Sequence, residues 1–450
     1  MQNITIFDYL LLPVYLFIFY IIVKKRSIKY TDADIRKFFF IAFFLRMFGA
    51  VAYSMMVQYY YGYGDSFIYY AGSNYLRDHL LQDADNIKYF FASAEDVEKW
   101  YNFEVGDISY AGYYGVASNL FVMKISAIIS LLAFNKFLII SLFFGFFSFA
   151  GQWRLFQVFN DINKGKHTKL LAWAVLYTPS IWFWGSGLMK DSICIGGIGF
   201  IVYYLYEIFI KKNFSLKSLF MLALMVYFVG SIKSYIIIIL TVSLATIIFF
   251  NLISGFKNIL VKGFVVLIFL FFTIVVAFVT NFADQLQIIA EESKAQVDTY
   301  QRNYEALQNE DETSRAGLKS NEIDASLGGM LLHSPVAIFT CLFRPFPWES
   351  GKIMILFTSL ESMLLLFSTL FLLFKLRILG FFRIIFSNPY LLFSLVISLL
   401  FALVIGFTTY NFGTMARYKI ILMPFYYFML VSLYIHVKAK KDKIIILNSP

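Results

Sequence analysis

The sequence has 450 residues, of which 60% are hydrophobic and only 15% are charged. A soluble fold cannot bury that much apolar surface, so the composition indicates a membrane protein and excludes an ordinary soluble enzyme. The formal net charge of +10 would suit nucleic acid, but Lys and Arg gather in short segments between apolar runs, which excludes that partner. The two cysteines, Cys194 and Cys341, lie in apolar stretches and predict neither a disulfide framework nor a metal site.

Long apolar runs predict an all-α fold, a polytopic membrane protein with about eleven transmembrane helices. These spans are expected near residues 6–23, 38–58, 137–158, 168–185, 191–210, 216–231, 234–251, 263–281, 353–374, 389–406 and 419–437. The basic cluster Lys24–Arg26 follows the first run instead of preceding it, so this run is expected to stay as a span and not to be cleaved as a signal. Basic clusters such as Lys438–Lys443 predict that the C-terminus lies inside and the N-terminus outside.

Residues 116–134 are also apolar enough to cross the membrane. A crossing there would move the basic segment DINKGKHTK to the outside, so we expect a helix that lies in the outer leaflet, with Lys124 near the headgroups. The alternative is a true span and one further crossing elsewhere. The topology predicts five segments: N-terminal helices at 1–58, a large outer loop at 59–136, a central bundle at 137–281, a second outer loop at 282–352, and C-terminal helices with a basic tail at 353–450.

The two large outer loops are predicted to contain helices that lie on the membrane surface, and long loops in a compact fold are usually functional. The phrase FRPFPWES in the second loop has two prolines around an aromatic residue, which predicts a broken, half-embedded backbone.

Charged side chains outside the basic inner loops are the candidates for function, because a charge at the bilayer centre costs about 2.5–3.5 kcal/mol. The predicted topology brings several of them to the outer side of the membrane from distant segments. The candidates are Asp65, Lys190, Asp191, Lys233, Arg344 and Arg417, with Arg46 inside the second span.

These candidates also have structural interpretations. Asp65 with Ser66, before FIYYAGSNYL, matches a helix N-cap. Lys190 and Lys233 could anchor helices at the interface, and Arg46 could pair with Glu361 in the ninth span.

Several fixed cations beside a membrane are suited to the phosphate or pyrophosphate of a lipid, and a carboxylate at the same level can accept a proton from a hydroxyl. Together they predict an inverting glycosyl transfer from a polyprenyl-linked donor to a hydroxyl acceptor. Asp65 is the expected base and Asp191 the alternative, while the four outer cations would hold the phosphate, supported by Arg46. No cofactor is predicted; Asp65 and Asp191 could bind a divalent metal, but two carboxylates do not define a site.

Aromatic side chains near the charged candidates could line sugar rings, although plain packing is the alternative for each ring. The candidates of this kind are Tyr69, Tyr70, Trp348 and Tyr410.

An apolar span followed by GDSFIYYAGSNYL and a surface-lying helix resembles the GT-C class of polytopic glycosyltransferases. PSIWFWGSGLMKDS, FRPFPWES and NFGTMARYK resemble the polymerases and ligases of bacterial surface polysaccharides, such as O-antigen. The resemblance implies a catalytic base at Asp65, lipid-pyrophosphate contacts at Arg344 and Arg417, and a bacterial inner-membrane protein whose site faces the periplasm. An extra N-terminal span and the lack of an acidic dyad at Asp65 depart from the pattern, so the role of Asp65 as base, ligand or cap stays open.

Two other classes of function remain possible on the residues alone. A transporter or flippase for lipid-linked glycans would place charges along a path through two related halves, which the sequence does not show. A non-catalytic scaffold of an envelope assembly would use the large outer loops to dock partners, and the charged helix expected at 283–308 suits that role.

Overall fold

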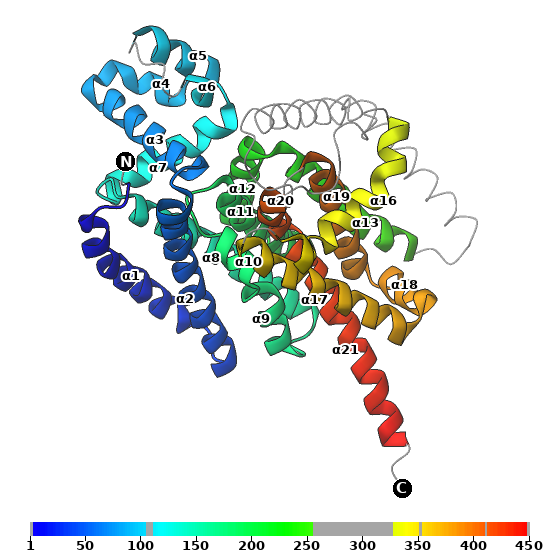
Figure 1. The fold of residues 1–450 in the computed structure, drawn as a ribbon. Coiled ribbons are helices and arrows are strands. Elements are labelled where there is room, and N and C mark those ends of the chain that lie inside the picture. The colour runs from blue at the N-terminus through cyan, green and yellow to red at the C-terminus, as the bar shows by residue number, and fades with distance from the viewer. Residues whose placement is uncertain (1–2, 105–110, 255–326, 351–352, 410–411, 448–450) are drawn as a thin grey trace. The chain divides into compact units, whose positions relative to one another are not determined.

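The computed structural model describes residues 3–104, 111–254, 327–350, 353–409 and 412–447 (Figure 1). Throughout these ranges the regular elements are helices, without a strand, which confirms the all-α prediction. The span expected at 263–281, the helix expected at 283–308 and the side chain of Tyr410 lie outside the described residues. The chain divides into two compact units, Met1–Ile237 and Ile238–Pro450.

Six helices among the described residues are long and apolar enough to cross a membrane. They are α1 (Ile6–Ser27), α2 with its terminal π turn (Ala33–Tyr61), α8 (Phe137–Ile162), α11 with its terminal π turn (Lys190–Ile210), α17 (Ile353–Leu376) and α19 (Pro389–Thr408). A seventh span is possible if α20 (Phe412–Tyr418) and α21 (Met423–Leu447) act together, although they are bent by 63°. The chain is therefore a multi-pass helical protein, with six or seven candidate spans in the described part where the sequence predicted about eleven over the whole chain.

The span expected at 168–185 is broken in the structure. It consists of α9 (Thr168–Leu176) and α10 (Pro179–Trp184), with 9 and 6 residues. Pro179 opens α10 at a position where its missing N–H costs nothing, and it disfavours helical backbone at the residue before it. At 1.5 Å per residue, neither piece can cross about 30 Å of hydrocarbon.

Four further helices of the described ranges have apolar stretches that are shorter than the six candidate spans. They are α7 (Ala117–Leu132), α12 (Leu216–Ile232), α13 (Ser234–Ser254, apolar over Ser234–Phe250) and α16 (Leu327–Phe343, apolar over Leu332–Phe343). The 16 residues of α7 extend over only about 24 Å at 1.5 Å per residue, so its length favours the predicted position in one leaflet over a crossing.

Helix α8 is the central helix of the first unit and packs against α2 and α11. Small residues let α8 and α11 approach at backbone distance. A Cβ added to Gly151 would lie 1.9 Å from the Gly196 carbonyl oxygen, and one added to Gly199 would lie 2.1 Å from the Gly151 carbonyl oxygen. Close backbone approach through small residues is a common packing mode of helices in lipid. The hydrophobic effect does not drive helices together there, because lipid chains are as apolar as the side chains, so van der Waals packing must do so.

The first outer loop folds into a set of helices between α2 and α8. After α3 (Asp65–Gln82) come a 3-10 turn (Ala84–Asn86), α4 (Ile87–Phe91), α5 (Ala94–Lys99), a π turn (Trp100–Glu104), α6 (Ala111–Tyr114) and α7. The Tyr114 hydroxyl donates to the Gly72 carbonyl at 2.8 Å and ties α6 to α3.

Lys124 on α7, which the sequence predicts near the headgroups, contacts the first outer loop. Its Nζ donates to the Ala92 carbonyl at 2.9 Å, next to α4, and burial lowers the pKa of its ammonium group. The side chain therefore joins α7 to the helices of the first outer loop.

In the second unit, α16 (Leu327–Phe343) and α21 pack against α19. Gly406 allows this contact, because a Cβ there would lie 2.4 Å from the Ala337 carbonyl oxygen. The FRPFPWES segment is non-helical after Phe343 apart from a 3-10 turn at Pro347–Glu349, as its prolines predicted. The amphipathic helix α18 (Ile378–Phe386) connects α17 to α19.

Candidate functional site

Charged side chains from three helices of the first unit come together near the start of α11. Lys190 and Asp191 are the first two residues of that helix, Lys233 ends α12, and Asp65 begins α3. The Lys190 ammonium group lies within electrostatic range of the other three charges. We name these four residues the Lys190 cluster.

The most buried part of the Lys190 cluster is an ion pair between α11 and the end of α12. Lys233 Nζ lies 2.7 Å from Asp191 Oδ1, and the two side chains are 9% and 2% exposed. Asp191 is in the first turn of α11, where the free backbone N–H groups also favour a negative charge. The pair therefore ties two helices together away from water.

Lys190 is the other cation in the cluster. Its side chain is half-buried, and its Nζ donates to Ser118 Oγ at 2.7 Å, at the beginning of α7. A hydroxyl is a neutral acceptor, so this bond does not cancel the charge of the ammonium group. Lys190 thus offers a positive charge between α11 and α7.

Asp65 is exposed and occupies the first position of α3. The N-cap is Gly64, which has φ 139 and ψ 172, and no side-chain capping bond is formed from that position. This backbone geometry is open to glycine and to few other residues. The N-cap is therefore Gly64 and not Asp65, one residue earlier than the sequence predicted. The Asp65 carboxylate lies in the first turn, where the helix dipole favours a negative charge.

Tyr53 on α2 links the segments that carry Asp65 and Lys190. Its hydroxyl lies 3.0 Å from Ser66 Oγ and 2.9 Å from Met189 Sδ, in the two residues adjacent to those charges. A Cβ at Gly187 would fall 2.0 Å from the Tyr53 ring, so only glycine lets the chain pass this close to α2.

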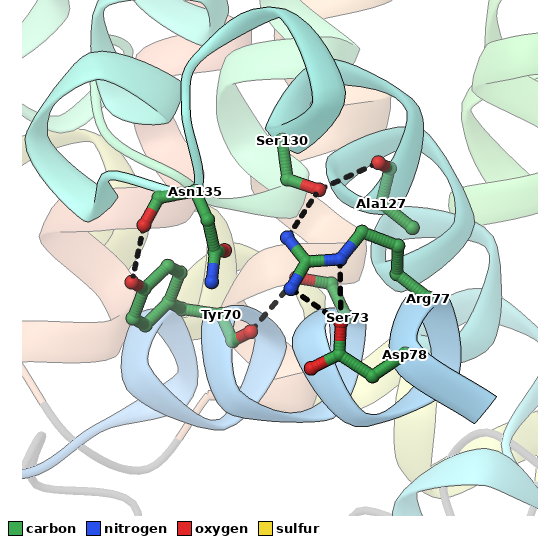
Figure 2. A network of polar contacts seen from close by, with 7 residues as sticks. All are labelled: Tyr70, Ser73, Arg77, Asp78, Ala127, Ser130 and Asn135. Carbon is green, nitrogen blue, oxygen red and sulfur yellow. Dashed lines mark hydrogen bonds and ion pairs between the residues drawn. The ribbon is translucent and has the colours of Figure 1, made fainter. Parts of the chain in front are cut away.

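A polar network holds α3 against α7 (Figure 2). Arg77 donates to Ser130 Oγ at 3.2 Å, and the Tyr70 hydroxyl donates to the Asn135 carbonyl at 2.9 Å. Both contacts join α3 to α7 or to the turn that follows it. They fix the helix that begins with Asp65.

The aromatic candidates are in different surroundings. Tyr69 is 5% exposed and donates to Asn119 Oδ1 at 3.3 Å, so it packs between α3 and α7, as Tyr70 does. Trp348 is 75% exposed and stacks on Phe346 with a centroid distance of 4.9 Å.

Arg46 lies in the middle of α2 and is 2% exposed. Its Nη1 donates to Ser148 Oγ on α8 and to the Gly185 carbonyl, both at 2.9 Å. Its Nη2 is buried and finds no hydrogen-bond partner in the part of the chain that the structure describes. Glu361, the partner considered for it, belongs to the second unit.

The second unit has its own group of charges. Arg344 Nε donates to Glu349 Oε1 at 2.9 Å, and its guanidinium lies 5.2 Å from the centre of the Phe412 ring. Glu349 also accepts from the Phe346 backbone N–H at 2.7 Å. Arg417 lies with its guanidinium 5.2 Å from the Tyr418 ring centre.

Lys419 is a buried cation that sequence analysis missed. It is 1% exposed, donates to Ser362 Oγ at 2.5 Å and to the Arg344 carbonyl at 3.3 Å, and interacts electrostatically with Glu361. Lys419 is the first residue of the span expected at 419–437, and the sequence alone does not indicate that its side chain is buried.

The structure thus brings together four of the five charged candidates of the first unit, as the Lys190 cluster, and separately Arg344 with Glu349. Convergence of Asp65 with Arg344 and Arg417 stays a prediction, since these residues belong to different units. Among the described residues no group of three or more His, Cys, Asp or Glu side chains is arranged to hold a metal ion.

Comparison with known proteins found no match to a family model, to a curated protein or to a solved structure. The resemblance to GT-C glycosyltransferases and to O-antigen polymerases therefore stays a prediction from short motifs.

Proposed function

We propose that this protein is a membrane-embedded glycosyltransferase or polysaccharide polymerase that uses a sugar linked to polyprenyl phosphate or pyrophosphate. Its site would face the periplasm from the inner membrane of a bacterium. The observation that supports the proposal is the Lys190 cluster, in which an exposed carboxylate and a half-buried ammonium group lie in electrostatic range of each other beside apolar helices.

The roles follow from burial and pairing. Asp65 is exposed and would act as the base that accepts the proton of the acceptor hydroxyl. Asp191 is nearly inaccessible and already pairs with Lys233, which suits it to holding α11 and α12 in place. Lys190 would bind the donor phosphate, because a fixed cation stabilises the charge that grows on the leaving group.

The proposed reaction is a single displacement with inversion at the anomeric carbon. The acceptor oxygen forms a bond to C1 of the donor sugar while the bond from C1 to the phosphate oxygen breaks. The proton of the acceptor hydroxyl passes to Asp65, and polyprenyl phosphate or pyrophosphate leaves with the bonding electron pair. The energy comes from the sugar–phosphate bond, so the reaction uses no nucleotide triphosphate.

Replacement of Asp65 by Asn tests the proposal directly. Loss of a general base usually lowers a rate by about 10²- to 10⁴-fold, so cells that carry Asp65→Asn should lose surface glycan at normal protein level. Native mass spectrometry of the purified variant should still show a polyprenyl-linked glycan adduct. Asp85→Asn is the matched control, because Asp85 is an exposed carboxylate in the same outer loop. Normal glycan output from Asp65→Asn would rule out the transferase mechanism.

A transporter of the same lipid-linked glycan is the second candidate, and Arg46 is the observation that favours it. Its guanidinium is buried in the middle of a candidate span, with an Nη2 that has no partner among the described residues. Ionisable groups at this depth often lie on transport pathways. In proteoliposomes loaded with the lipid-linked glycan, a transporter should lose activity with Arg46→Gln and keep it with Asp65→Asn.

A further inference from the structure

A second site is present in the first unit, where α1, α2, α8 and α11 surround a cleft of about 500 Å³. The cleft lies beside the basic C-terminal turn of α1 and residues 146–154 of α8, and it is formed within the first unit alone. None of the residues of the Lys190 cluster lines it.

Four cations line the cleft, and no acidic side chain does. They are Lys25, Arg26, Lys29 and Arg154. Across the described ranges, none of the four forms an ion pair with a carboxylate. Arg154 is held in place by a bond from its Nη1 to Gln157 Oε1 at 3.0 Å and by the Tyr203 ring, whose centre is 4.3 Å from its Cζ. The cleft therefore presents positive charge that the protein itself does not neutralise.

Aromatic rings form the inner wall of the same cleft. Phe39 and Trp153 are each 3% exposed, with ring centres 4.7 Å apart, and Phe149 packs against Phe39. Trp153 Nε1 donates to the Tyr30 hydroxyl at 2.6 Å, which fixes the indole beside the basic residues. A ligand that fills the cleft must be anionic at one end and apolar along the rest.

The side of α1 next to the cleft is apolar and exposed. Ile22 lines the cleft and is 48% exposed, and Ile18 and Ile21 on the same helix are also exposed. Because α1 is long and apolar enough to span a membrane, these exposed residues are suited to lipid chains. The cleft thus opens along the part of α1 that acyl chains would cover.

We propose that this cleft binds one anionic phospholipid. Its phosphate would lie among Lys25, Arg26, Lys29 and Arg154, and an acyl chain would pack along Ile22 and the aromatic wall. Basic pockets between transmembrane helices are typical binding places for anionic headgroups. The aromatic wall favours a lipid over a free phosphate, which would gain nothing from it.

The test measures lipid binding to the full chain by native mass spectrometry in detergent. Dioleoyl phosphatidylglycerol is the anionic probe and dioleoyl phosphatidylcholine the zwitterionic one. Wild-type protein should retain one phosphatidylglycerol at least tenfold more tightly than phosphatidylcholine. Each juxtamembrane cation contributes about fivefold, so Lys25→Gln/Arg26→Gln/Arg154→Gln should weaken phosphatidylglycerol binding on the order of 100-fold.

The control variant Lys24→Gln/Lys37→Gln/Lys217→Gln removes the same charge from exposed positions that do not line the cleft. It should bind phosphatidylglycerol as wild type does; an equal loss would show general surface attraction and overturn the proposal. Equal binding of the two lipids by wild type would also overturn it, and so would displacement of phosphatidylglycerol by millimolar inorganic phosphate. If the triple variant does not fold, Lys25→Gln/Arg26→Gln changes only exposed side chains and should still lose on the order of 25-fold.

Discussion

Among its described residues, each unit of the chain contains one ion pair in which both side chains are less than a quarter exposed. The two pairs differ in the sequence separation of their partners. Asp191 and Lys233 are 42 residues apart on separate helices, and their side chains are 2% and 9% exposed. Arg344 and Glu349 are five residues apart around a proline-containing turn, with 22% and 20% exposed. The first pair joins helices, whereas the second closes one turn.

The difference in exposure determines how much stability is lost when one partner of each pair is removed. Removing one partner of a buried pair leaves the other charge without compensation in a low dielectric, which costs several kcal/mol. A partly exposed charge can bind water when its partner is removed, so the cost is smaller. We infer that the Asp191–Lys233 pair stabilises the fold of the site. In the more exposed Arg344–Glu349 pair, either side chain can replace its partner by water or by another group at a lower cost.

Replacement of Asp191 by Asn should have the largest effect on stability. We expect a loss of about 3–5 kcal/mol, because Lys233 would stay buried without this carboxylate. The measurement is thermal or denaturant unfolding of the purified protein in detergent. The double variant Asp191→Asn/Lys233→Gln should recover at least half of the loss. A change below about 0.5 kcal/mol for the single variant would contradict the role given to this pair.

Replacement of Glu349 by Gln should have a clearly smaller effect, about 1 kcal/mol. The amide keeps one acceptor oxygen for the Phe346 N–H or for Arg344, and water can reach the turn. The same unfolding measurement applies. A loss as large as that of Asp191→Asn would remove the distinction between the two pairs.

Replacement of Asp78 by Asn should have the smallest effect, below about 0.5 kcal/mol. Asp78 is 56% exposed and pairs with its neighbour Arg77 at 2.6 Å, while Arg77 keeps its bond to Ser130 on α7 (Figure 2). The difference from wild type should vanish at about 1 M salt, where the screening length is about 3 Å. A difference that persists at high salt would show that Asp78 acts through packing.

Part of the candidate site was predictable from the sequence. Lys190, Asp191 and Lys233 were recognised as charges at the ends of apolar runs, and the structure places them together with Asp65. The sequence could not show that Asp191 pairs with Lys233 while Lys190 donates a hydrogen bond to the Ser118 hydroxyl. These contacts depend on how each helix is rotated about its axis. Lys419 was missed for a similar reason, since its depth depends on where the last helix begins and bends.

The sequence by itself determined that the fold is helical and that several of its helices are long and apolar enough to cross a membrane. A run of about 20 apolar residues must satisfy its backbone within itself in lipid, and this is a local requirement. The tertiary structure decided that glycines bring α8 and α11 into backbone contact. It also decided which charges meet and that a basic, aromatic-walled cleft forms beside α1. In a chain with 54 Phe and 31 Tyr, apolar character alone does not specify which face of a helix packs on which neighbour.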